Sequence, residues 1–304
     1  LGRVRNKQGR LLGKMEALGF DVRSATNLGV LTSDVVKSSA IEGEALPTGE
    51  VRSSIARRLG LDVGGLPKAS RAVEGIVEMM LDATQRCRAP LTKERLFAWH
   101  TSLFPTGRTA MGRIKVGAWR TSESGPMQVV SGALGRETVR FEAPDSARLD
   151  AGVDAFLAWF NAPRASDPVL VAGVAHLWFV TIHPFEDGNG RIARAIADMS
   201  LARADAVAER FYSMSTQIEA ERSRYYAELE SAQRGSLDIT AWLAWFLACL
   251  ERSIDTAERS LASVLHKGEV WRRLQPHALN ERQRRIVNRV LDGFDAALTT
   301  SKYA

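Results

Sequence analysis

The residue types that can do chemistry gather in one twelve-residue stretch, HPFEDGNGRIAR, at positions 183–194. Its Gly-Asn-Gly turn allows a tight backbone path whose N–H groups point at one anion, and the helix that follows adds its positive dipole end. Two arginines spaced three apart share a helix face and can bind different phosphate oxygens. The predicted phosphate-binding residues are Gly188, Asn189, Gly190, Arg191 and Arg194.

Two further side chains in this stretch suit phosphate chemistry. Asp187 directly precedes the glycines, where a carboxylate can hold Mg²⁺ beside substrate phosphates. His183 has an imidazole whose free pKa is near ~6.5, which suits it to taking a proton from an attacking group. The alternative is a solvated loop with two surface arginines. That alternative needs an anion turn, a base, a metal carboxylate and paired arginines to coincide by chance.

The stretch resembles, at every defining position, the signature HPFx(D/E)GNGRxxR of the Fic (filamentation induced by cyclic AMP) family. The resemblance implies transfer of AMP from ATP to a Ser, Thr or Tyr hydroxyl of a target protein. His183 would be the catalytic base, and Asp187 would hold Mg²⁺. Arg191 would bind the β-phosphate and Arg194 the γ-phosphate, while the Asn189 side chain would stabilise charge on the transferred group.

A second stretch, Ser38-Ser-Ala-Ile-Glu42-Gly43, reads on composition alone as the end of a short helix. We expect that helix to span about 33–43, with a cap at Thr32 or Ser33 and Gly43 in the left-handed conformation. The stretch also resembles the inhibitory motif (S/T)xxxE(G/N) of the Fic family. The resemblance implies that Glu42 reaches the second signature arginine and takes the place of a γ-phosphate, with Ser38 one turn above it.

Composition restricts the class of protein. The 304 residues are 45% hydrophobic and 25% charged, with a net charge of +6, as in a soluble globular protein. No apolar run approaches the ~20 residues of a membrane span. Cys87 and Cys249 have no metal-site spacing, which favours free thiols and a cytoplasmic location. The chain begins Leu-Gly-Arg without Met or a signal segment, so we expect that residues precede it in the natural protein.

The spacing of apolar residues predicts a mainly α-helical bundle around these stretches. Between positions 107 and 147, short β-type runs at 127–130 and 139–141 predict one small hairpin. The predicted helices after the first 60 residues, numbered by their ends, are 70–86, 96–103, 149–160, 169–182, 191–203, 218–234, 239–250 and 256–271. The fold class is therefore all-α with a small β-hairpin.

The hairpin and one later helix carry further predictions. The resemblance implies that the hairpin, at about 116–142, is the flap, which aligns a target segment by strand pairing. Its pairing edge would be Met127, Gln128, Val129 and Val130. A hairpin that merely covers the core is the alternative. Composition makes Tyr225 and Tyr226 half-buried packing residues, whereas the resemblance implies a tyrosine near the adenine. We expect His100 to pack against Trp99 or to bond to backbone.

We expect three segments: an N-terminal helical region at 1–68, a Fic domain at 69–275, and the start of a winged-helix-like module at 276–304. The arginines of the last segment leave two uses open, a solvated face or DNA binding by the full-length module. Transfer of UMP, phosphate or phosphocholine, removal of AMP, and a nucleotide-sensing DNA-binding regulator also stay open. The target also stays open, and the protein itself is one candidate. The oligomeric state stays open as well, with a homodimer among the alternatives.

Overall fold

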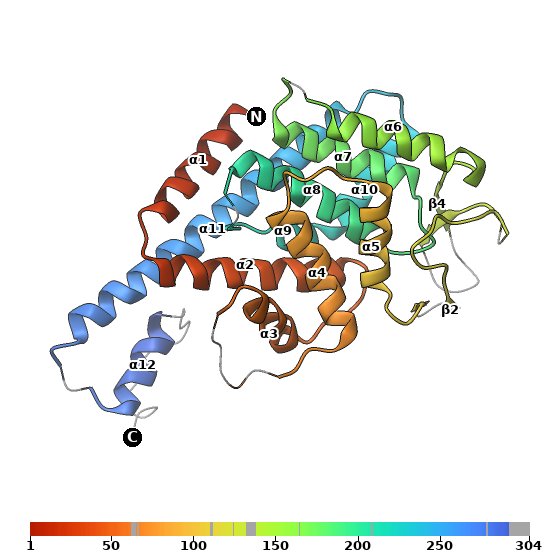
Figure 1. The fold of residues 1–304 in the computed structure, drawn as a ribbon. Helices are drawn as coiled ribbons and strands as arrows, with labels where there is room; N and C mark the ends of the chain where they lie inside the picture. The colour runs from red at the N-terminus through yellow and green to blue at the C-terminus, as the bar shows by residue number, and fades with distance from the viewer. Residues whose placement is uncertain are drawn as a thin grey trace. The chain divides into compact units, whose positions relative to one another are not determined.

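The computed structural model describes residues 1–291 apart from 62–64, 66, 110–111, 124, 132–137, 164, 208 and 278. Over the described residues the chain forms twelve α-helices, one 3₁₀ turn (Ser146–Arg148) and two antiparallel strand pairs (Figure 1). The predicted all-α class with a small hairpin is confirmed. The chain divides into two compact units, Leu1–Ile254 and Asp255–Ala304.

Two antiparallel helices form the centre of the first unit, α7 (Pro168–Ile182) and α8 (Asn189–Asp205). The start of α7 is well specified, because the Asp167 carboxylate accepts the Val169 N–H at 2.9 Å and Pro168 occupies the first turn. Apolar residues cover α7 on nearly all sides, and both helices are buried along most of their length. The signature stretch joins them and is therefore held between two rigid elements.

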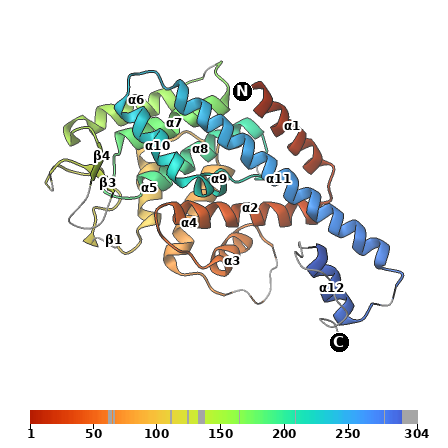
Figure 2. The ribbon, with the colours of Figure 1, turned by 180° about the vertical axis from the view of Figure 1, so that it is seen from behind.

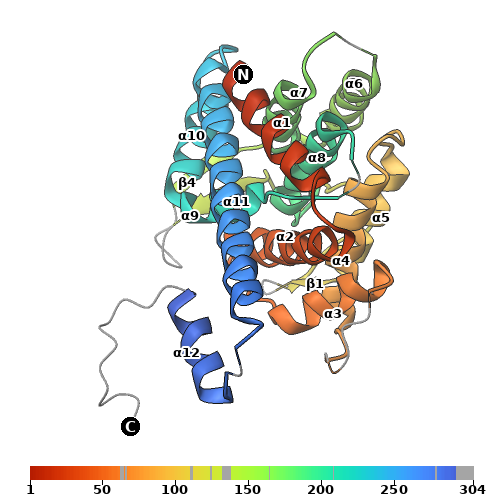
Figure 3. The same ribbon diagram turned by 90° about the vertical axis from the view of Figure 1, so that its left-hand side faces the viewer.

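Among the described residues, eight further helices of the first unit surround this centre, and a ninth, α11, continues into the second unit. In Figure 3, α3 lies beside α2 and α4, while α4 and α2 also contact α8. These helices are α1 (Gly2–Glu16), α2 (Phe20–Ile41), α3 (Thr48–Arg58), α4 (Arg71–Gln85), α5 (Lys93–Leu103), α6 (Leu149–Asn161), α9 (Met214–Ala220), α10 (Arg222–Arg234) and α11 (Thr240–Leu274).

The predicted hairpin is present as β3 (Gln128–Ser131) and β4 (Thr138–Glu142), which pair antiparallel with a register irregularity between Val129 and Val130. The residues at 132–137, which join the strands, lie outside the described part of the chain. The end of α10 lies against β4 (Figure 2), where the Arg234 guanidinium donates to the Arg140 and Val139 carbonyls at 3.0 and 2.9 Å. The flap is thus attached to the helical core.

A second short strand pair, β1 (Arg108–Thr109) with β2 (Gly112–Arg113), was not predicted.

Three helix boundaries differ from those that the sequence predicts. The inhibitory stretch is not a short helix from 33 but the end of α2, which begins at Phe20. The Thr32 hydroxyl does not cap; it donates to the Leu28 carbonyl at 2.6 Å, one turn back inside the same helix. The predicted helix at 218–234 is interrupted at Glu221. The two predicted at 239–250 and 256–271 form one continuous helix, α11.

The second unit contains the end of α11 and α12 (Glu281–Leu291). Within it, the Trp271 indole N–H donates to Asn288 at 3.1 Å. The rest of the predicted winged-helix opening, at 292–304, lies outside the described residues. None of the described helices is long and apolar enough to cross a membrane.

Candidate active site

The signature loop begins with an unusual backbone conformation at His183. This residue ends α7 with φ 51° and ψ 56°, in the left-handed region that non-glycine residues enter at a cost of about 1–2 kcal/mol. Its N–H still bonds to the Phe179 carbonyl at 3.0 Å, so the turn closes the helix and redirects the chain toward α8. A non-glycine residue held here indicates that the position of its side chain matters.

The protonation state of His183 follows from its neighbours. Its Nδ1 lies 3.1 Å from the Val180 carbonyl, which can only accept, so Nδ1 carries the proton. Nε2 is therefore left with a lone pair. Burial lowers the pKa of His183 to about 4, outweighing the Val180 bond, so the ring is neutral near pH 7. A neutral imidazole with a free Nε2 can accept a proton.

Two side chains hold the loop in shape. The buried Asn189 amide bonds twice to the Phe185 backbone, accepting its N–H at 3.0 Å and donating to its carbonyl at 2.8 Å. The buried His100 ring stacks on the Phe185 ring at 4.1 Å, approaches the Asp187 carbonyl at 3.2 Å, and accepts the Gly117 N–H at 3.1 Å. His100 therefore bonds to backbone, one of the two arrangements expected. In this structure the Asn189 amide supports the loop, and its contribution to charge on the transferred group stays a prediction.

The second signature arginine, Arg194, binds the end of α2. Its Nε donates to the Ser38 hydroxyl and its Nη2 to the Ser38 carbonyl, both at 2.9 Å, and Nη2 also reaches the Glu42 carboxylate at 2.8 Å. Burial by itself would raise the pKa of Glu42, but the Arg194 guanidinium holds it below its ordinary value. Glu42 is therefore ionised, and its charge offsets that of an arginine only 2% exposed.

The first signature arginine binds a residue that the sequence analysis missed. Gly43 adopts φ 85°, and this left-handed turn after α2 brings Glu44 back toward α8. The Glu44 carboxylate accepts from Arg191 at 2.6 Å, while the same guanidinium lies 3.6 Å from Asp187 and 5.0 Å from the Phe104 ring centre. The available signal was a second glutamate two positions after Glu42, on the far side of the glycine.

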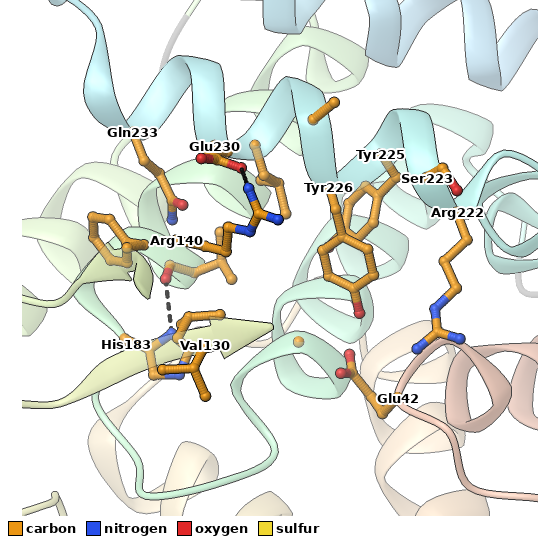
Figure 4. A pocket seen from close by; sticks show the side chains of 16 residues that line it. Glu42, Val130, Arg140, His183, Arg222, Ser223, Tyr225, Tyr226, Glu230 and Gln233 are labelled. Atoms are coloured by element: carbon orange, nitrogen blue, oxygen red, sulfur yellow. Dashed lines mark hydrogen bonds and ion pairs between the residues drawn. The ribbon is translucent and has the colours of Figure 1, made fainter. Parts of the chain in front are cut away.

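A cavity of about 610 Å³ lies beside these groups (Figure 4). Its wall includes His183 and Gly190 from the signature, Glu42 from the inhibitory stretch, strands of the flap, and one face of α10. The volume falls within the range of about 300–1,000 Å³ that small-molecule sites occupy. The structure thus brings the predicted base and the predicted inhibitory carboxylate to one cavity.

The two predicted tyrosines lie on the α10 side of this cavity. Tyr226 is 38% exposed, and its hydroxyl donates to the Ile41 carbonyl at 3.2 Å, at the end of α2. Tyr225 is buried, with its hydroxyl 2.9 Å from Nε2 of the buried His176. Figure 4 shows the Tyr226 ring extending from α10 toward Glu42, with His183 at the left of the view. Both tyrosines line the cavity, and contact of either ring with an adenine stays a prediction.

Only half of the predicted pairing edge faces the cavity. Val129 and Val130 line it, and Val130 is 49% exposed. Met127 instead accepts the Ala143 N–H on its carbonyl at 2.9 Å, which extends the hairpin beyond β3. The Gln128 side chain bonds to Glu142 across the strands at 2.8 Å.

Comparisons with known proteins agree with this geometry. Residues 90–201 match the Fic/DOC family, and residues 1–61 match a domain of unknown function, DUF4172. The chain is 27% identical over 228 residues to "Protein adenylyltransferase Fic" of Aedes aegypti, covering 73% of this chain and 40% of that protein. It is 33% identical over 134 residues to the protein of the same name from Drosophila virilis, covering 40% of this chain and 26% of that one. The chain thus spans two fifths or less of these relatives.

Solved structures show the same fold. A Fic family protein from Desulfovibrio desulfuricans G20 aligns with a TM-score of 0.60 at 21% identity, covering 84% of this chain and 73% of that one. Fic-1 from C. elegans aligns with a TM-score of 0.54 at 20% identity, covering 86% and 73%. The HPFEDGNGRIAR loop between α7 and α8 lies within residues 90–201, the part of the chain that matches the Fic/DOC family.

Proposed function

We propose that the protein is an adenylyltransferase that moves AMP from ATP to a Ser, Thr or Tyr hydroxyl of a target protein. One observation carries this proposal: the free Nε2 of a neutral His183 belongs to a ring lining a nucleotide-sized cavity, next to the N-terminus of α8. A base at that place suits attack on a phosphate held by the helix terminus. The names of the relatives from Aedes and Drosophila support the same reaction.

In the proposed reaction the target hydroxyl oxygen attacks the α-phosphorus of ATP while its proton passes to His183 Nε2. A new oxygen–phosphorus bond forms, the bond from the α-phosphorus to the bridging oxygen breaks, and pyrophosphate leaves in line. The N–H groups at 188–190 would stabilise charge on the transferred group. Arg191 would bind the β-phosphate and Arg194 the γ-phosphate. Tyr225 or Tyr226 would contact the adenine.

Asp187 is the residue that would hold Mg²⁺. Its side chain is 32% exposed, beside the N-terminus of α8. Among the described residues no group of three His, Cys, Asp or Glu could hold a metal. One carboxylate nevertheless fits, because Mg²⁺ usually takes one or two carboxylates and completes its shell with phosphates and water. Bound there, the ion would neutralise charge on the α- and β-phosphates.

The contacts of the two signature arginines support an inhibited state. Glu42 occupies Arg194 and Glu44 occupies Arg191, so both guanidinium groups are neutralised by carboxylates from one turn. A triphosphate would have to displace both to bind with its β- and γ-phosphates on these arginines. We infer that the protein is normally held off and that release of this turn activates it. Activation of water by Glu42 to remove AMP remains open on the same geometry.

The test replaces Glu42 and His183. Removing the Glu42 carboxylate frees Arg194, so Glu42→Gly should raise the incorporation of label from α-³²P-ATP into lysate protein or into the protein itself. Adding His183→Ala to this variant should abolish incorporation while calorimetry still detects ATP binding. No gain from Glu42→Gly would remove the inhibitory role, and unchanged labelling without His183 would remove the base. Mass spectrometry of the labelled protein identifies the target and the added group.

Donors other than ATP would bind in the same cavity. UMP, phosphate or phosphocholine transfer would use the same arginines and base, so a panel of nucleotides in calorimetry with the Glu42→Gly protein decides between them.

DNA binding rests only on the exposed arginines of α12, Arg282, Arg284, Arg285 and Arg289, in a helix also suited to solvent. It predicts a steep salt dependence of duplex binding. A homodimer and a cytoplasmic location stay predictions.

A further inference from the structure

We propose that Arg120 is a positioning residue for the catalytic base. Its guanidinium ties His183 to both ends of the flap segment, the stretch from Arg120 to Pro144 that carries β3 and β4. The proposal rests on the proposed function in one respect, that His183 is the base. Arg120 lies just ahead of the flap strands and outside the signature.

Arg120 bonds to the signature loop twice. Its backbone N–H donates to the Pro184 carbonyl at 3.0 Å, and its Nε donates to the His183 carbonyl at 2.8 Å. Two successive carbonyls at the left-handed turn are therefore held by one residue. The His183 side chain follows from this backbone, because Nδ1 reaches the Val180 carbonyl only while the turn keeps its conformation.

The same guanidinium also binds the far end of the flap segment. Its Nη2 donates to the Pro144 carbonyl, two residues after β4 ends at Glu142. Arg120 itself precedes β3, so the segment that leaves the core at Arg120 returns to it at Pro144. One side chain thus fixes both ends of this segment against the peptide of His183.

The chemistry of the contacts requires arginine. The side chain is buried, with 5% of the residue exposed, and none of the described carboxylates lies within ion-pair distance of it, although the charge of Asp145 acts on it from farther away. A buried cation without a carboxylate partner is costly unless its donors are satisfied, and here backbone carbonyls satisfy them. The planar guanidinium directs Nε and Nη2 along different fixed lines, which the single ammonium at the end of a flexible lysine side chain cannot reproduce.

Arg120 links the strands that would position a target to the end of α7, which positions the base. A target segment aligned along β3 is positioned by the flap, whereas the proton acceptor is positioned by the end of α7. Arg120 joins the two, so the distance from an incoming hydroxyl to His183 Nε2 depends on it. Misplacement by about 1 Å lowers a rate by as much as ~100-fold, while binding of the nucleotide, which uses α8 and α10, is left intact.

Arg234 provides the matched control. It also donates to two carbonyls of the flap segment, Arg140 and Val139, but within the described part of the chain no bond joins it to the signature loop. A role limited to fastening the flap predicts the same effect from either arginine. A role in placing the base predicts an effect on the His183 ring from Arg120 alone.

The experiment measures three quantities in Arg120→Gln, Arg120→Lys and Arg234→Gln. Single-turnover AMP transfer in the Glu42→Gly background should fall about tenfold to a hundredfold in Arg120→Gln, with the Kd for ATP within about twofold. NMR of ¹⁵N-histidine protein follows the ring of His183, identified among five histidines by the His183→Ala spectrum. The charged groups acting on that ring are Arg120, Glu42 and Asp187. Loss of the Arg120 cation should raise the pKa of His183, and Arg234→Gln should not.

The outcomes separate this proposal from the proposed function. If the Glu42→Gly protein transfers no AMP, the function fails, and the NMR titration alone decides on Arg120. A His183 titration unchanged by Arg120→Gln, or equal rate losses from Arg120→Gln and Arg234→Gln, overturns the proposal. If Arg120→Gln does not melt cooperatively, Arg120→Lys carries the test: a lower rate at unchanged ATP affinity supports the proposal, and the wild-type rate overturns it.

Discussion

Gly190 is the residue at which the proposed phosphate site meets the Glu42 carboxylate. A Cβ added there would overlap the Glu42 carboxylate and would also lie 3.2 Å from Nη1 of Arg194. Because Gly190 has no side chain, its backbone can approach a phosphate closely. For the same reason Glu42 can approach Arg194. A phosphate bound here, as we propose, and the Glu42 carboxylate would exclude each other, which would be the physical basis of the proposed switch.

Gly190→Ala should lower the free energy of unfolding by about 1–3 kcal/mol, because the added methyl group displaces Glu42 from Arg194. In the Glu42→Gly background the clash is gone and the same substitution should cost much less. Urea denaturation of the four proteins gives this coupling. Gly152→Ala, inside α6 with nothing within 4 Å of its Cβ, is the control and should not destabilise. Equal losses in both backgrounds would contradict the prediction.

At the scale of elements, the turn between α2 and α3 presents two carboxylates to one helix. Because α2 ends at Ile41 and Gly43 reverses the backbone, residues 42 and 44 both face α8, whose arginines at 191 and 194 are one turn apart. Tyr226 of α10 fastens the same turn through the Ile41 carbonyl. Release of the turn would therefore remove the carboxylate partners of both arginines together, while Arg194 kept its bonds to Ser38.

This arrangement predicts the effect of Glu44. Glu44→Gln should tighten ATP binding by about threefold, since Arg191 loses a carboxylate partner that is 46% exposed and its bond is weakened by solvent. Added to Glu42→Gly, it should produce a further gain of similar size. Calorimetry measures the Kd for ATP, and Glu78→Gln, which lies on α4 away from the site, is the control. An unchanged Kd in both backgrounds would show that Arg191 is available to phosphate while Glu44 is present.

The sequence predicted those site residues that lie within one continuous motif, and it did not reveal residues recognisable only by contacts with distant parts of the chain. The signature could be interpreted residue by residue because its base, turn and arginines follow one another in the chain. Glu42 lies 152 positions from Arg194 and was assigned through the resemblance of its motif, whereas Glu44 and Arg120 lie outside both motifs and each bonds to a residue more than 60 positions away. The start of α2 was misplaced because Thr32 has the side chain of a cap, yet bonds back into a helix stabilised by its packing.

At the scale of the whole molecule, the fold class was predictable from apolar periodicity, whereas several boundaries were not. Glu221 breaks the predicted 218–234 helix, and its carboxylate binds Arg252 of α11 at 2.6 Å. That contact links residues 31 positions apart, so no local pattern could reveal it. The continuous α11 likewise lacks an internal Gly or Pro between 250 and 256, and the predicted break there was wrong.

Buried histidines make stability depend on pH. His176 is buried between α7 and α10, where its Nε2 meets the Tyr225 hydroxyl, and burial lowers its pKa to about 3. The unfolded chain binds a proton at this position near pH 6.5, and the folded protein does not. Between these values the unfolded state holds more protons, so stability is present above pH 6.5 and is lost as the pH falls. Raised pKa values of Asp198 and Asp205, which burial causes, act in the opposite direction.

A variant isolates the contribution of one histidine from these opposing groups. His176→Gln retains an amide that can bond to Tyr225 but no longer titrates. Below pH 6 the wild type should lose stability faster than the variant by about 1.4 kcal/mol per pH unit, down to about pH 4. Urea denaturation at pH 7, 6, 5 and 4.5 provides the free energies of unfolding. Parallel curves for the two proteins would mean that His176 takes up its proton in the folded state, and that the α7–α10 contact admits water.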